Sequence, residues 1–211
     1  MNRAKSNFGK RRSHLPRESD LVFRLLLLVI TLIFGGYAPT DSFSQETVVV
    51  SDDTAQIKKL AESGDAQAQF SYALMLDEGR GVAMDKSEAI TWFQKAAEGG
   101  IPAACLYLGI KYEFGNTVEQ NIFQAIKWYK KAAFQDWPDA QFHLGRVFLE
   151  GGNDVIDYVQ SYAWLGLAEE ADYPGAGETK EKVKALLSAH DISRAEELQA
   201  KLRLQILRTS K

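Results

Sequence analysis

The chain contains very little of the chemistry that metal sites and disulfides need. Its 211 residues include one cysteine, Cys105, and three histidines, His14, His143 and His190. One cysteine forms no internal disulfide, and the histidines lie too far apart for the ligand spacing of a zinc site. The G-x-S-x-G, H-E-x-x-H, Walker A and EF-hand patterns are also absent from the sequence. We therefore predict no metal, no cofactor and no catalytic residue.

Basic residues are scarce over most of the chain. Residues 1–44 hold seven basic and three acidic residues, and subtracting these from the totals of 25 and 28 leaves 18 and 25 for residues 45–211. The larger part therefore carries a net charge of −7. Because nucleic-acid binding needs a basic surface, we predict no nucleic-acid partner.

An unbroken apolar run, Leu25 to Phe34, follows the basic N-terminal segment. It is shorter than the roughly 20 apolar residues that span a membrane, and a basic segment before such a run is typical of a signal peptide. The small residues Ser42 and Ser44 suit cleavage before Gln45, so we predict a signal peptide at 1–44 and an exported protein. The alternative is an uncleaved membrane anchor, because the basic segment is long and no A-x-A site is present.

Three 36-residue units follow one another without gaps, at 64–99, 100–135 and 136–171. Five columns carry matching residue types: Ala68, Ala104 and Ala140; Gly79, Gly115 and Gly151; Asp85, Asn121 and Asp157; Trp92, Trp128 and Trp164; and Ala96, Ala132 and Ala168. Matches at one fixed spacing are the signature of a repeat array, in which each unit buries its apolar face against the next.

Each unit predicts two helices. Ala66 to Glu78 carries apolar residues at helical spacing, and Gly79 can end that helix in the left-handed conformation. Asp85 opens a second helix from about Lys86 to Glu98, with Glu88 three residues later as in a capping box. The same pairing recurs in the second unit, with Asn121 and Gln124, and in the third, with Asp157 and Gln160.

The tryptophan column and the cysteine each allow a structural and a functional interpretation. The tryptophans could form an aromatic platform for a ligand, but their repetition at core spacing favours packing between neighbouring helix pairs. Cys105 stands in the column of Gln69 and Gln141 beside a small alanine, which predicts a partly buried, inert thiol.

Incomplete copies of the unit flank the array. Residues 52–63 match the second helix of a leading half-repeat, so we predict an N-terminal capping helix there, after a linker at 45–51. Residues 173–211 lose the pattern but stay helical, which predicts C-terminal capping helices and a tail. The segment Ser188 to Leu207 begins with a Ser-x-x-Asp cap and is the expected closing helix.

These columns resemble the Sel-one-like (Sel1-like) repeat family, a branch of the tetratricopeptide-repeat class. The first unit fits its pattern at Ala66-Gln67-Ala68-Gln69-Phe70, Gly79, Asp85, Ala89, Trp92-Phe93 and Lys95-Ala96-Ala97. The resemblance covers about 54–172, and the tail is similar to the terminal extension of exported bacterial members. The third unit departs at Ser161 and Leu167, as an end repeat would. The resemblance implies an all-α, right-handed superhelical solenoid of antiparallel helix pairs that holds other proteins together.

In arrays of this class, the resemblance implies, the first helices line the concave side and bind peptides. The varied first-helix positions Tyr107, Lys111, His143 and Arg146 are the predicted partner-binding residues, and an ordinary solvated helix face is the alternative. Phe114 and Phe134 each stand where the other two units have glutamate. An apolar residue in place of a charge at a helix end suggests an extra contact, within the array or with a partner.

The sequence thus predicts an exported, periplasmic or secreted adaptor that binds a protein or peptide and is not an enzyme. One alternative is a hydrolase of cell-wall or β-lactam type, although relatives described as β-lactamase-like are rich in cysteine. The other is a structural module tethered to the inner membrane through an uncleaved Leu25 to Phe34 segment, which would be its only membrane contact.

Overall fold

The computed structural model describes residues 46–152 and 154–209, with side chains from residue 53 onward. All of these residues except Glu46 belong to one compact unit. The predicted signal peptide or anchor at 1–44 and the cleavage before Gln45 lie outside the described residues. Within the described part, the helices are too short or too polar to cross a membrane.

The described residues form nine helices and no strand, so the predicted all-α solenoid of helix pairs is confirmed. In chain order the helices are α2 (Glu46–Glu62), α3 (Ala66–Glu78), α4 (Lys86–Glu98), α5 (Pro102–Phe114), α6 (Ile122–Ala133), α7 (Pro138–Glu150), α8 (Tyr158–Glu170), α9 (Ala176–Lys184) and α10 (Ala189–Thr209).

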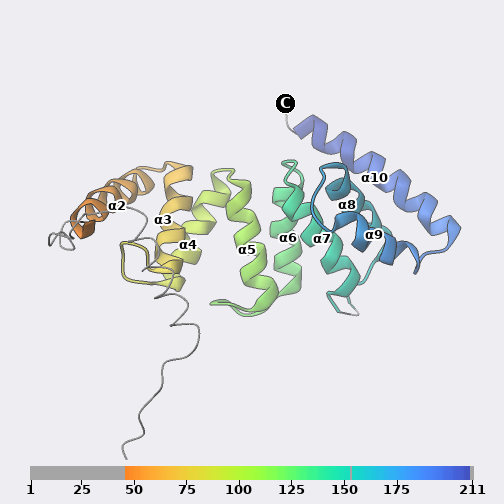
Figure 1. Cartoon of the computed structure of the whole chain (residues 1–211), viewed down its shortest axis with the longest axis horizontal. Helices are drawn as coiled ribbons and strands as arrows, with labels where there is room; N and C mark the ends of the chain where they lie inside the picture. The colour runs from red at the N-terminus through yellow and green to blue at the C-terminus, as the bar shows by residue number, and fades with distance from the viewer. Residues whose placement is uncertain (1–45, 153, 210–211) are drawn as a thin grey trace, which may run out of the picture. The chain divides into compact units, whose positions relative to one another are not determined.

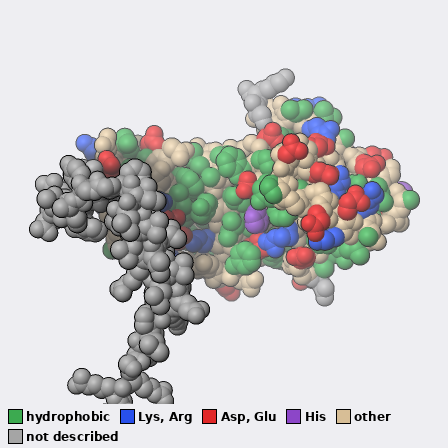
Figure 2. Space-filling view, in the orientation of Figure 1, with side chains coloured by type: hydrophobic (Ala, Val, Ile, Leu, Met, Phe, Trp, Pro, Cys, Tyr) green, Lys and Arg blue, Asp and Glu red, His purple; other side chains and the backbone are tan. Residues whose placement is uncertain are grey.

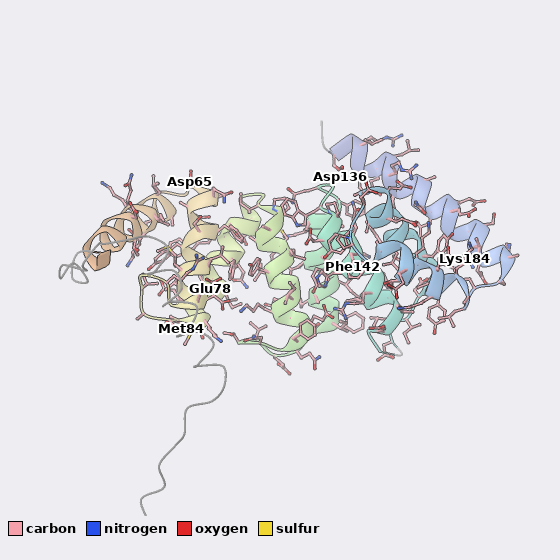
Figure 3. The ribbon with its side chains drawn as sticks, viewed as in Figure 1. Asp65, Glu78, Met84, Asp136, Phe142 and Lys184 are labelled. Atoms are coloured by element: carbon pink, nitrogen blue, oxygen red, sulfur yellow. The ribbon has the colours of Figure 1, made fainter. Side chains whose placement is uncertain are left out.

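Each unit contributes one helix pair, and the pairs follow one another along the array (Figure 1). The first helices are α3, α5 and α7, and each packs against the second helix of its own unit, α4, α6 or α8. The second helices α4 and α6 also pack against the first helix of the next unit, α5 and α7 respectively. Asp65 and Asp136, in the turns before α3 and α7, lie along one edge, whereas Glu78 and Met84 lie along the other (Figure 3). First helices therefore run in a common direction.

The second helices begin where the capping residues predicted. Asp85 Oδ1 accepts the N–H of Glu88 at 2.8 Å. In a complete capping box the N–H of Asp85 would also donate to the side chain of Glu88. Here that N–H donates instead to the carbonyl of Leu76 in the first helix, at 3.0 Å. The same two bonds recur with Asn121, which pairs with Gln124 and Tyr112, and with Asp157, which pairs with Gln160 and Phe148. The cap thus also fixes the two helices of a unit to each other.

The first helices end differently in the third unit. Gly79 and Gly115 adopt the predicted left-handed conformation, with φ of 70° and 67°. Gly151 stands in the same column but has φ of −72°, and the left-handed residue is Gly152, with φ of 97°. The predicted glycine cap is therefore confirmed in two units and displaced by one residue in the last.

The repeated columns form the core, as the spacing predicted. Trp92, Trp128 and Trp164 are 8%, 9% and 1% exposed, so the packing interpretation of the tryptophan column is confirmed. Small residues let the two helices of a unit approach closely. A Cβ on Gly109 of α5 would lie 2.4 Å from the ring of Tyr129 on α6, so only glycine fits at this crossing.

The segment before the first unit differs from the prediction. Residues 46–51 belong to α2 and not to a linker, because the helix begins at Glu46. No proline or glycine lies between Glu46 and Ser63 to stop helix propagation toward the N-terminus. The amide of Gln69 donates to the carbonyl of Ala61 at 3.2 Å and joins α2 to the first unit.

The closing helix α10 reaches back over the end of the array. Ser188 Oγ accepts the N–H of Asp191 at 3.2 Å and caps the start of α10. Both α9 and α10 pack against α8. Near its other end, the hydroxyl of Thr209 donates to the carbonyl of Phe134 at 2.8 Å, across 75 residues of sequence. The last helix therefore connects the third unit to the end of the second.

Candidate functional site

The four predicted partner-binding residues lie on two neighbouring first helices. Tyr107 and Lys111 lie on α5, and His143 and Arg146 lie on α7. On the face seen in Figure 2, hydrophobic side chains gather over the middle of the array, and charged side chains crowd over α8 to α10. The pair on α5 and the pair on α7 have different surroundings.

Tyr107 belongs to an aromatic cluster that joins three helices. Its ring stacks on Phe93 of α4, with centroids 5.3 Å apart and planes 18° apart. Phe70 of α3 meets the same ring edge-on at 5.7 Å. Tyr107 remains half-buried, so one part of a rigidly held aromatic ring is accessible to a partner.

Lys111 is held inside the array by an ion pair. Its Nζ lies 2.7 Å from both carboxylate oxygens of Asp77 on α3. The side chains of Lys111 and Asp77 are only 9% and 15% exposed. The ammonium therefore joins two consecutive first helices. Its role toward a partner stays a prediction, and a partner would have to compete with Asp77 for it.

Arg146 is placed by a second ion pair of the same kind. Its guanidinium donates to Glu113 Oε1 on the preceding first helix, α5. The Glu113 side chain is 8% exposed, whereas that of Arg146 is 26% exposed. The hydroxyl of Tyr129 donates to the other carboxylate oxygen at 2.6 Å. Burial, and then the hydrogen bond to Glu113, raise the pKa of Tyr129 above its ordinary value, so the phenol keeps its proton.

His143 lies beside this pair but is not a cation at neutral pH. Its ring stacks on Tyr129 with centroids 5.1 Å apart, and its Nδ1 is 3.9 Å from Glu113 Oε2. Burial, and then the charge of Arg146, lower the pKa of His143. Among the described residues, Nδ1 has no hydrogen-bond partner. The sequence correctly placed His143 and Arg146 on one helix, and the structure brings them together around Glu113.

Sequence reasoning missed the two acidic residues, Asp77 and Glu113. They occupy the same column, 36 residues apart, and each pairs with a base 34 or 33 residues further on. An acidic residue that recurs in the column just before the end of the first helix was the signal available in the sequence. The pairs hold α3 to α5 and α5 to α7.

The two unusual phenylalanines have different roles. Phe134 packs edge-on against Trp164 at 5.4 Å and accepts the Thr209 hydroxyl at its carbonyl, so its extra contact is internal. Phe114 is 62% exposed, and the guanidinium of Arg146 lies 5.9 Å from its ring centre. Phe114 is therefore an exposed aromatic residue next to a predicted binding residue.

The remaining reactive groups offer little chemistry. Cys105 was predicted to be partly buried, but it is fully buried, with 0% exposure. Burial raises the pKa of its thiol. No group of three or more His, Cys, Asp or Glu side chains in the described part of the chain could hold a metal ion. The described geometry thus presents a surface of aromatic, apolar and charged side chains.

Comparison with known proteins gives the family. The model of the Sel1 repeat matches residues 66–101, 102–135 and 138–173. A solved Sel1 repeat protein from Oxalobacter formigenes is 33% identical, with a TM-score of 0.57 over 62% of this chain and 98% of that one. A protective antigen of uropathogenic Escherichia coli strains with an SLR fold is 39% identical, with a TM-score of 0.54 over 56% of this chain and 25% of that one.

No curated protein matches the chain. The family match covers the three units, and each of its three segments begins at the first residue of a first helix, α3, α5 or α7. Sel1 repeat proteins generally mediate interactions between proteins. The chain belongs to the Sel1 repeat family.

Proposed function

We propose that the chain is an exported adaptor that binds a protein or peptide across the exposed face of its first helices, α3, α5 and α7. Membership of the Sel1 repeat family supports the mode of action. The repeated columns are buried in the core. Recognition therefore depends on the columns that differ between units.

Tyr107 is the observation that carries the proposal. Phe93 and Phe70 hold its ring, so little conformational entropy is lost when a partner packs against it. Half-buried apolar side chains lie on the same helices, at Leu74 of α3 and Ile110 of α5. Rigid tyrosines surrounded by apolar contacts dominate the binding energy of many interfaces.

Arg146 and Phe114 extend this surface toward α7. Glu113 fixes the guanidinium of Arg146 in place, and the exposed ring of Phe114 lies beside it. Arginine and aromatic residues are enriched in protein interfaces, because each combines apolar area with directional contacts. A partner that covers both residues would bury an aromatic ring that is now 62% exposed.

Crosslinking in cells tests this face directly. A photoreactive phenylalanine derivative replaces Phe114, whose exposure makes the replacement easy to accommodate. Phe123, at the start of α6, is the matched control, because it is also a phenylalanine and is also 62% exposed. We expect a specific protein crosslink from position 114 and not from position 123.

The opposite results would count against the proposal. Capture of nothing at position 114, from cells in which the protein is abundant, or equal capture at both positions, would remove the first-helix face as the binding surface. A Tyr107→Ala variant provides a second measurement: it should weaken the crosslink at position 114 while circular dichroism shows that the helices remain.

Export is the second part of the proposal. The basic segment and the apolar run Leu25 to Phe34 support it. Mass spectrometry of the protein isolated from cells should find an N-terminus at Gln45. A protein that retains residues 1–44 would instead support the inner-membrane anchor.

A further inference from the structure

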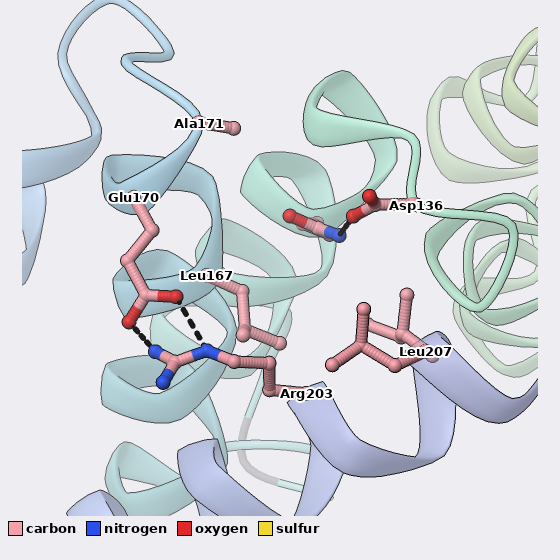
Figure 4. Close-up of a pocket in the computed structure, with 8 residues that line it drawn as sticks. Asp136, Leu167, Glu170, Ala171, Arg203 and Leu207 are labelled. Carbon is pink, nitrogen blue, oxygen red and sulfur yellow. Dashed lines mark hydrogen bonds and ion pairs between the residues drawn. The ribbon is translucent and has the colours of Figure 1, made fainter.

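A pocket lies where the turn before α7, the end of α8 and the last part of α10 meet (Figure 4). Its volume is about 340 Å³. Leu167 of α8 and Leu207 of α10 provide apolar walls. None of the four predicted partner-binding residues lines it. We call it the terminal pocket, and a ligand bound there would be independent of a partner bound to the first helices.

An ion pair occupies one side of the terminal pocket. Arg203 of α10 donates to both carboxylate oxygens of Glu170, with Nε 2.8 Å from Oε2. Gln199 also donates to Glu170, at 2.5 Å. Figure 4 shows the two bonds between Arg203 and Glu170 at the side of the pocket. The charge of the guanidinium is therefore compensated by Glu170, which weakens its attraction for an anionic ligand.

On the other side, Gln141 provides a buried acceptor. The Gln141 residue is 1% exposed, and its Nε2 donates to the Ala133 carbonyl and the Asp136 carboxylate at 3.4 and 3.3 Å. The bond to Ala133 repeats the one between Gln69 and Ala61, so the fold of the repeat orients this amide. Among the described residues, no donor reaches Gln141 Oε1. A buried acceptor without a donor destabilises the protein, and a ligand that donates to it would remove that cost.

Asp136 adds a carboxylate that the earlier units lack. It has φ of 57°, and Gly64 and Gly100 hold the same column in the left-handed region. Left-handed backbone strains residues with a Cβ, although aspartate tolerates it better than most. No cation of the described residues pairs with Asp136, whose carboxylate accepts only the Gln141 amide. The turn thus carries an uncompensated negative charge at the mouth of the terminal pocket.

We propose that the terminal pocket binds an organic cation that has a primary ammonium or a guanidinium group on a short aliphatic chain. The cation would pair with Asp136 and donate to Gln141 Oε1, and the aliphatic chain would pack against Leu167 and Leu207. Two carboxylates and one arginine give the lining a net charge of −1. This chemistry occurs in lysine and arginine side chains and also in free alkylamines.

Titration of the full chain with n-butylammonium tests the proposal, with n-butanol as the neutral ligand of equal length. Nuclear magnetic resonance follows the side-chain amide of Gln141. We expect a saturable shift with n-butylammonium and at least tenfold weaker binding of n-butanol, because the neutral alcohol cannot form the charge-assisted bond to Asp136. Equal binding of the two ligands, or no saturable shift, would overturn the proposal.

Two variants separate the pocket from a general charge effect. Asp136→Gly restores the residue of the first two units and relieves the left-handed strain, so it should fold, and it should weaken n-butylammonium binding about tenfold. Asp172→Gly is the matched control, because Asp172 is also left-handed, with φ of 55°, and does not line the pocket. It should leave binding unchanged. Equal losses in both variants would refute a specific site.

A lysine capped at both ends distinguishes the two sources of the cation. Binding of Nα-acetyl-lysine methylamide at least as tight as that of n-butylammonium supports a side chain from a protein partner. Binding of n-butylammonium alone supports a free amine. In both cases Gln141→Met, which removes the acceptor, should weaken binding, and unchanged affinity in this variant would exclude the assigned role of Gln141.

Discussion

The ammonium of Lys111 lies 2.7 Å from both carboxylate oxygens of Asp77, which belongs to the preceding unit. Glu113 and Arg146 repeat this relationship one unit later. Charge pairs therefore supplement apolar packing at both junctions between consecutive first helices.

Removal of one partner from the first pair should destabilise the fold. Lys111→Met leaves the Asp77 carboxylate buried without its cation, and we expect a loss of about 3 kcal/mol in the free energy of unfolding. Urea denaturation followed by circular dichroism measures it. The double variant Lys111→Met with Asp77→Leu should recover most of the loss, because no unpaired charge remains. A single variant as stable as the parent would show that the pair contributes nothing.

His143 should make stability depend on pH. Burial and Arg146 lower its pKa, against smaller opposite effects of Glu113 and Asp139. The folded state therefore binds this proton more weakly than the unfolded chain, whose histidine pKa is about 6.5. Its contribution is complete above that pH and is lost as the pH falls toward the lowered pKa.

His143→Phe keeps a ring on Tyr129 and removes the titration, so it is the matched variant. The unfolding free energy of the parent should fall more steeply than that of His143→Phe between about pH 7 and pH 5. Parallel profiles would contradict the assignment. In Arg146→Met the histidine pKa should rise, which a proton resonance of the imidazole reports.

Gly109→Ala should show how closely α5 and α6 approach each other. The new Cβ would lie 2.4 Å from the ring of Tyr129, and the hydrogen bond to Glu113 prevents an easy shift of that ring. We expect a loss of about 1–3 kcal/mol in stability. The same change made together with Tyr129→Leu should cost less than in the parent, and equal costs would place the strain elsewhere.

The capping residues Asp85, Asn121 and Asp157 should contribute similarly. Replacement of any one by alanine removes the side-chain acceptor of the second helix and should lower stability by about 1 kcal/mol. Because the three caps lie in different units, the losses should add in the triple variant. Thermal or urea unfolding tests both statements, and a loss confined to one unit would show that the units differ in local stability.

Local chemistry made much of the fold predictable. Asp85 and Gly79 mark helix boundaries through hydrogen bonds within a few residues, and the observed helices begin and end at those positions. The tryptophan column was predictable because burial recurs at the same spacing. The extension of α2 to Glu46 was missed because the repeat pattern ends before that segment, although helix propagation does not.

The site residues were less predictable, because their contacts depend on the offset between neighbouring helices. The sequence predicted Lys111 as a partner-binding residue on the first-helix face, yet in the structure it pairs with Asp77, 34 residues earlier. The offset between Glu113 and Arg146 is 33 residues, so the repeat length alone does not identify the pairs. The terminal pocket depends on α10, whose path over the array no repeated column indicates.

The contact between Thr209 and Phe134 also bears on how such a protein can lengthen during evolution. Each earlier second helix faces the next unit, but α8 faces α9 and α10, and α10 is bonded back to the second unit. A duplicated unit appended after the third would have to displace both helices. Duplication of a unit within the array would instead leave α9 and α10 in place on α8. We therefore expect such arrays to lengthen by insertion of units inside the array.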